Sequence, residues 1–249
     1  MAKLKRKHYL GFLSVIVFVF IWYLFSLSVN NQFILPSPIK VIESLFNILT
    51  EIKTYEVIGF TLIRLIISFA LSAVLAIILG IISGNYKIID EILHPFIITL
   101  RTLPVASIIV IMLIIFGNEL SLLLITFVMV FPIIYEGSKQ GVLNISEELK
   151  NTITMETNHK LEIMAKLHLP LAMPYIKTAL LQSFGLGFKV IVMAEFISQT
   201  SKGIGNELFQ GSISIEYELV FAWTIILIVL VMIVEVIVKS INNKIKKKA

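Results

Sequence analysis

Four ionisable side chains lie within stretches that are otherwise apolar enough for a lipid bilayer. Arg101, Lys189, Glu195 and Glu235 are flanked by long runs of Ile, Leu, Val and Phe. A charge inside the hydrocarbon region is costly, so such residues usually face a cavity, a water-filled path or an opposite charge. Arg101, Lys189 and Glu195 are therefore candidate residues of a path for a polar solute.

Helical spacing limits which of these charges can pair. Lys189 and Glu195 are six residues apart, or about 240° around a helix, so they cannot meet on one helix. Lys189 is expected either to line a path or to pair with Glu235 or with Glu195 of a second copy. Glu195 is near the outer end of its span, which favours a structural role over one in the path. Glu235 and Lys239 have the i,i+4 spacing of a structural ion pair.

Motifs for catalysis within this chain are missing from the sequence. It contains no GxxxxGK[ST] phosphate-binding loop, no HExxH, no GxSxG and no cysteine. His159 and His168 are nine residues apart, which is not a metal-ligand spacing. These observations predict a protein that is not an enzyme and carries no cofactor or metal of its own. The net charge of +5 comes from basic residues beside apolar runs, which indicates membrane topology rather than nucleic-acid binding.

The elements that must position these residues are predicted to be membrane-spanning helices. The chain is 57% hydrophobic and 15% charged, with a mean hydropathy of +0.95, where a soluble domain has about 25% charged residues. We expect an all-α, polytopic membrane protein with about six spans. The predicted spans cover residues Tyr9–Val29, Ile58–Ser83, Pro95–Phe116, Leu120–Tyr135, Leu171–Ser198 and Leu219–Ile241.

Basic residues orient this layout. With both termini in the cytoplasm, the outer segments contain only Lys40, Lys53 and Lys202, and most other basic residues fall inside. Apolar residues at helical spacing over 39–49 predict an amphipathic helix on the outer surface.

Residues 145–170 form a polar island that this orientation places in the cytoplasm. The pattern predicts a helix–turn–helix, with a break at Thr157-Asn158 and an end at Pro170. A polar segment of this length between two spans indicates a docking site for a soluble protein. The alternative is a plain amphipathic connector that lies on the lipid headgroups.

Several short motifs occur in an order that resembles a known family. They include Leu35-Pro36-Ser37-Pro38, Thr61–Gly80 with Arg64, LeuArgThrLeuPro at 100–104, and Leu167-His168-Leu169-Pro170 followed by AlaMetProTyrIle at 172–176. Phe116-Gly117, MetAlaGluPhe at 193–196 and Gly203-Ile204-Gly205 complete the set. The chain resembles the inner-membrane permeases of binding-protein-dependent ABC importers, in the group that serves sulfonates, taurine, nitrate or thiamine-precursor pyrimidines.

The resemblance implies where a partner ATPase would dock. The family's EAA triplet, counted back from Pro170, falls on Asn151-Thr152-Ile153, and its glycine falls on Thr157. These residues depart from the family pattern, and Asn158 is expected to take the conformational role of the glycine. The implied docking residues are Leu149, Asn151, Thr152, Ile153, Thr157 and Asn158.

The resemblance also implies how the protein assembles and works. We expect one permease domain over 1–249, with an anchor span and outer helix in 1–57, core spans in 58–241 and the coupling loop at 145–170. Two copies, expected as a homodimer in the bacterial inner membrane, would enclose the path. An ATP-binding cassette subunit would hold ATP and Mg²⁺, and an extracytoplasmic binding protein would deliver a small organic anion or heteroaromatic nutrient. The alternatives are a stand-alone secondary transporter, which would favour inverted repeats, and a non-transport membrane scaffold.

Overall fold

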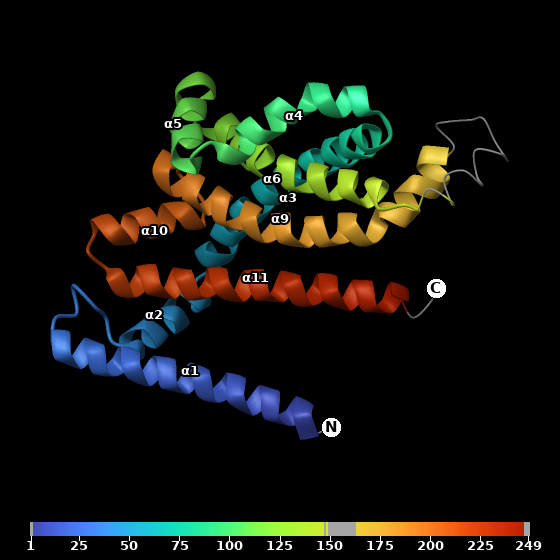
Figure 1. Cartoon of the computed structure of the whole chain (residues 1–249). Coiled ribbons are helices and arrows are strands. Elements are labelled where there is room, and N and C mark those ends of the chain that lie inside the picture. Colours follow the sequence, from blue (N-terminus) through green and yellow to red (C-terminus); the bar gives the residue numbers. More distant parts are fainter. Residues whose placement is uncertain (1, 147, 149–162, 247–249) are drawn as a thin grey trace.

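The computed structural model describes residues 2–146, 148 and 163–246, and within these ranges the chain is helical without strands (Figure 1). All-α architecture is thus confirmed. The helices in chain order are α1 (Ala2–Val29), α2 (Pro38–Thr50), α3 (Ile52–Asn85), α4 (Lys87–Thr102), α5 (Val105–Phe116), α6 (Asn118–Leu143), the π-helical turn η1 (Met164–His168), α9 (Leu169–Ser198), α10 (Ile204–Ile213) and α11 (Tyr217–Lys246).

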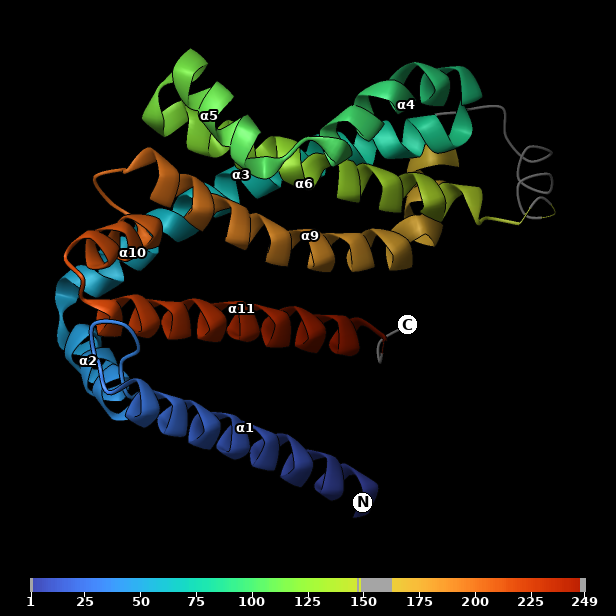
Figure 2. The same ribbon diagram turned by 60° about the vertical axis from the view of Figure 1, so that its left-hand side comes forward.

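Helices α3, α6 and α9 form the centre of the molecule (Figures 1 and 2). Small residues allow their backbones to approach closely, as is common between membrane helices. A Cβ added to Gly80 would lie 2.5 Å from the Tyr135 carbonyl oxygen, and one on Gly137 would lie 2.3 Å from the Ala179 Cβ. The helices therefore pack at a distance that only glycine permits at these positions.

The described helices agree with a polytopic membrane protein. α3, α6, the stretch Lys166–Ser198 and the stretch Tyr217–Val234 are each long and apolar enough to cross a bilayer. α4 and α5 together pass the same test as one bent pair, and α1 is apolar over Leu13–Val29. Four helices, or five if the bent pair is one span, thus meet the membrane-length test among the described residues, and α1 overlaps the first predicted span with a shorter apolar stretch.

The predicted third span, Pro95–Phe116, is wrong as a single helix. α4 begins earlier, at Lys87, and the chain bends by 102° between Thr102 and Val105. Leu103 has an extended backbone with φ −65° and ψ 132°, because the residue before a proline is disfavoured in the helical region. The apolar run continues through this break, so hydropathy alone did not reveal the bend.

Pro170 does not end a helix as predicted. It lies in the first turn of α9, where its missing N–H is not needed, and η1 leads directly into that turn. The central part of the predicted helix–turn–helix, 149–162, lies outside the described residues. It contains the predicted docking residues Leu149, Asn151, Thr152, Ile153, Thr157 and Asn158.

Two short helices lie toward the end of the molecule that carries the 199–203 loop (Figure 2). The predicted helix at 39–49 is confirmed as α2, which starts where the Ser37 side chain accepts a hydrogen bond from the Lys40 N–H. Its buried face packs on α11 and α3. α10 follows Gly203, whose φ of 134° favours glycine, and the sequence analysis did not predict this helix.

Candidate functional site

One face of α9 carries polar side chains that are exposed although the helix is long and apolar enough to span a membrane. Tyr175, Thr178, Gln182 and Lys189 are all exposed. Their separations of three, four and seven residues place them on one side of the helix. We call these four residues the α9 stripe. Exposed polar groups at membrane depth indicate contact with water, solute or another polar surface rather than with lipid tails.

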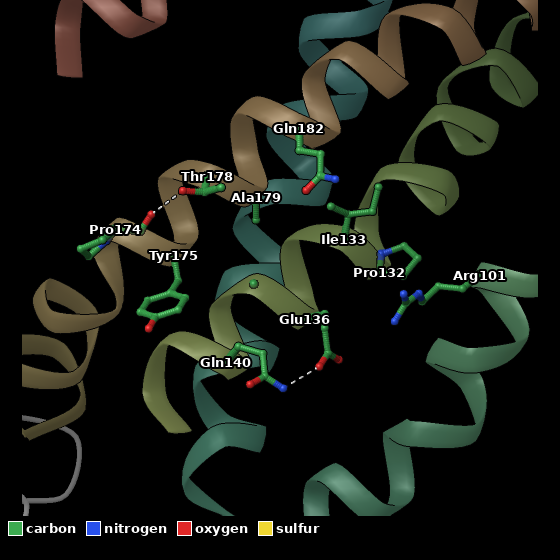
Figure 3. Close-up of a pocket in the computed structure, with 11 residues that line it drawn as sticks. Arg101, Pro132, Ile133, Glu136, Gln140, Pro174, Tyr175, Thr178, Ala179 and Gln182 are labelled. Atoms are coloured by element: carbon green, nitrogen blue, oxygen red, sulfur yellow. Dashed lines mark hydrogen bonds between the residues drawn. The ribbon is translucent and has the colours of Figure 1, made fainter. Parts of the chain in front are cut away.

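The N-terminal part of the α9 stripe borders a hollow of about 550 Å³ between α4, α6 and α9 (Figure 3). Its walls combine charged, amide and hydroxyl groups with two prolines and small residues. They are Arg101 from α4, Pro132, Ile133, Glu136, Gly137 and Gln140 from α6, and Pro174, Tyr175, Thr178, Ala179 and Gln182 from α9.

Packing at the base of the hollow explains how its walls meet. Gly137 lets α6 contact α9 at Ala179. α4 is held to α6 by the buried Lys139, whose Nζ lies 2.8 Å from Asp90 Oδ1. The Tyr135 hydroxyl donates to the same carboxylate over 3.1 Å. These contacts fix the helix that carries Arg101.

The polar groups of the hollow are unequally paired. Glu136 Oε1 accepts a hydrogen bond of 2.9 Å from the Gln140 amide, and Glu136 Oε2 lies 3.7 Å from Lys139 Nζ. Arg101 extends from α4 toward α6 (Figure 3) and, among the described residues, has no carboxylate within 4.0 Å. The Glu136 charge is thus countered nearby, whereas no carboxylate of the described residues counters the Arg101 charge.

Lys189, farther along the same stripe, lines a different cavity. This second groove has a volume of about 540 Å³ and lies between α9, α10 and α11. Apart from Lys189 it is lined by apolar side chains such as Phe188, Met193 and Leu227. No acidic residue of the described part of the chain lies within ion-pair distance of Lys189.

Glu195 points away from the stripe and is fully buried in a hydrogen-bond network. Its carboxylate accepts from the Thr61 hydroxyl at 2.9 Å, from the Gly205 N–H at 3.0 Å and from Arg64 Nη1 at 2.9 Å. Arg64 Nη2 in turn donates to both oxygens of Glu119, at 2.9 and 3.0 Å. The network joins α3 to the ends of α6, α9 and α10, so the geometry gives Glu195 a structural environment.

The structure therefore separates the three path candidates of the sequence analysis. Arg101 lines the hollow and Lys189 the second groove, while Glu195 lies within the protein. Lys189 is exposed and Glu195 is buried, which agrees with the roughly 240° that separates the two side chains around the helix. Sequence reasoning missed Glu136 and Gln140. It also missed Tyr175, Thr178 and Gln182, although their helical spacing with Lys189 was a readable signal.

Comparison with protein families gives one match over residues 76–247, more than half of the chain. The matching family is described as the binding-protein-dependent transport system inner membrane component. The match begins within α3 and includes the hollow, the second groove and the island at 145–170.

Relatives with related names match over most of their lengths. An ABC transporter permease protein of Brucella melitensis biotype 1 is 25% identical over 213 residues, covering 85% of each chain. The bicarbonate transport system permease protein of Synechococcus elongatus is 27% identical over 77% of this chain and 73% of its own. The taurine transport system permease protein of Escherichia coli K12 is 22% identical over 94% of this chain and 87% of its own.

Proposed function

The chain belongs to the binding-protein-dependent transport system inner membrane components, and from that premise we propose that two copies of it enclose a solute path along the α9 stripe. It is the membrane permease subunit of an ABC importer and a multi-pass protein of the inner membrane.

The observation that carries this proposal is the exposure of Tyr175, Thr178, Gln182 and Lys189 on one face of a membrane-length helix. Four polar groups facing lipid tails would be unfavourable. A second copy that faces this stripe across a water-filled path would hydrate them. Tyr175, Thr178 and Gln182 of the stripe also line the hollow, so its other polar residues would border the same path.

A separate ATP-binding cassette subunit supplies the energy in this proposal. It docks on the cytoplasmic island at 145–170, which connects α6 to α9, the two helices that wall the hollow. ATP binding would draw the two islands together and switch the path between inward-open and outward-open states. An extracytoplasmic binding protein would deliver the solute to the outward-open state.

The cargo that we propose is a small anion with an oxygen-bearing head group. Two of the relatives are named as permeases for bicarbonate and for taurine. Both of these solutes present an oxygen-bearing group. The positive charge of Arg101 in the hollow supports the same class.

Substitutions in the island test the coupling. The island meets an ATPase through Ile153 and Thr157 in this proposal, so Ile153→Asp with Thr157→Arg would place unpaired charges in that contact. We expect the double variant to insert in the membrane but to lose co-purification of the ATP-binding cassette subunit and transport. Lys160→Gln, in the same polar island, serves as the control. Co-purification and transport that survive the double substitution would show that docking occurs elsewhere.

A further inference from the structure

We propose that the hollow between α4, α6 and α9 is a binding site for oxyanion head groups, with the Arg101 guanidinium as its specificity-determining group. This inference rests on the proposed function, because it assigns a recognition step to the membrane subunit itself. Solute selection would then not be left entirely to the binding protein.

Arg101 has the chemistry that an oxyanion requires. Its guanidinium is planar, permanently charged and able to donate two parallel hydrogen bonds to carboxylate- or sulfonate-like oxygens. The side chain is exposed at the hollow and is not committed to a carboxylate among the described residues. A cation at this depth needs an anion or water, and a passing anionic solute meets that need.

The surrounding groups can complete the recognition of the head group. The Gln182 amide and the Tyr175 hydroxyl line the same hollow and can donate to further oxygens of the solute. Pro132, Ile133 and Ala179 provide apolar surface for a short carbon chain. Their combination fits a small organic oxyanion better than a fully hydrated inorganic ion.

Among the described residues that line the hollow, Glu136 is the one acid, and it bears on the charge of the preferred solute. Its carboxylate is engaged by Gln140 and lies 3.7 Å from the Lys139 ammonium. Lys139 also pairs with Asp90 at 2.8 Å. Among the described residues, Arg101 is the charged residue of the hollow that has no opposite charge within 4.0 Å. We therefore expect its guanidinium to attract anions in preference to cations.

The test uses the permease in complex with its ATPase in lipid nanodiscs, without binding protein. Ethanesulfonate is titrated by isothermal calorimetry, and ethylammonium is titrated as the opposite charge. We expect weak, saturable binding of ethanesulfonate and none of ethylammonium. Arg101→Gln should weaken ethanesulfonate binding by about tenfold or more, and Arg101→Lys should weaken it less, because lysine keeps the charge but loses the planar fork.

Lys177→Gln is the matched control, since it removes a cation from α9 at a half-buried position that does not line the hollow. It should bind ethanesulfonate as the unsubstituted chain does. Thermal melting and ATPase co-purification establish that each variant is folded and assembled.

Equal ethanesulfonate binding by Arg101→Gln and the unsubstituted chain would overturn the inference. So would tighter binding of ethylammonium, or an absence of saturable anion binding. In each of these cases, binding-protein-dependent transport by the same complex would leave the proposed function standing. Loss of ATPase association from the unsubstituted chain would contradict the proposed function instead.

Discussion

At the scale of single residues, the charged side chains Lys189 and Glu195 of α9 differ in exposure and therefore in role. Glu195 accepts hydrogen bonds from donors on two other helices, α3 and α10, whereas Lys189 is exposed in an apolar groove. The sequence predicted that these two side chains point in different directions, because helix geometry fixes that angle. It could not predict the Arg64–Glu195 pair, whose members are 131 residues apart in the chain.

Glu195→Ala tests the structural role of the buried network. The substitution leaves the Thr61 hydroxyl and the Gly205 N–H without their acceptor and removes one carboxylate from the buried Arg64. We expect a loss of about 3 to 5 kcal/mol in stability, seen as a lower melting temperature in detergent. Glu207→Ala, which removes the partner of the largely exposed Lys53, should cost at most about 1 kcal/mol. A melting temperature that Glu195→Ala leaves unchanged would contradict the structural role.

Lys189→Met separates the two interpretations of that lysine. If Lys189 lines the path, the variant should fold, bind the ATPase and show altered transport or altered solute-stimulated ATP hydrolysis. If it pairs with an acid of a neighbouring helix or of the second copy, the orphaned carboxylate should lower the melting temperature, and removing that acid as well should restore it. We expect the first result, since no described acid lies near Lys189. Unchanged transport with a large loss of stability would refute it.

At the scale of helices, tight packing and backbone breaks decide which faces meet. The sequence indicated the positions of the apolar helices well, because each has membrane length and composition. It did not indicate the bend at Leu103-Pro104 or the close α6–α9 contact at Gly137. The bend follows from the local effect of Pro104 on Leu103, which a hydropathy pattern does not register. The Gly137 contact depends on which residues from distant parts of the chain come together.

Gly137→Ala is predicted to disrupt the α6–α9 contact on which the hollow depends. Its Cβ would lie 2.3 Å from the Ala179 Cβ, so the helices must separate at a cost of about 1 to 3 kcal/mol. Gly59→Ala on α3 is the control, because nothing lies within 4 Å of its added Cβ. That control should be neutral or stabilising by up to about 1 kcal/mol. Equal changes in melting temperature for Gly137→Ala and Gly59→Ala would argue against close packing at Gly137.

At the scale of the whole molecule, the distribution of charge predicts how the chain crosses the membrane. The polar island should be cytoplasmic and the loop at 199–203 should be outside. The chain contains no cysteine, so single cysteines can be introduced without removing native thiols. We expect Ser201→Cys to react with an impermeant maleimide in intact cells and Ser146→Cys to react only after permeabilisation. The reverse pattern would invert the topology.

The central claim, that the α9 stripe lines a solute path, is tested most directly by thiol accessibility during transport. Gln182→Cys is compared with Leu71→Cys, which lies on an exposed and apolar face of α3. We predict that a small hydrophilic methanethiosulfonate reagent modifies Gln182→Cys in the assembled transporter and blocks solute uptake. Leu71→Cys should remain unmodified and active because its thiol faces lipid. Equal resistance of both positions to the reagent, with transport intact, would contradict the claim.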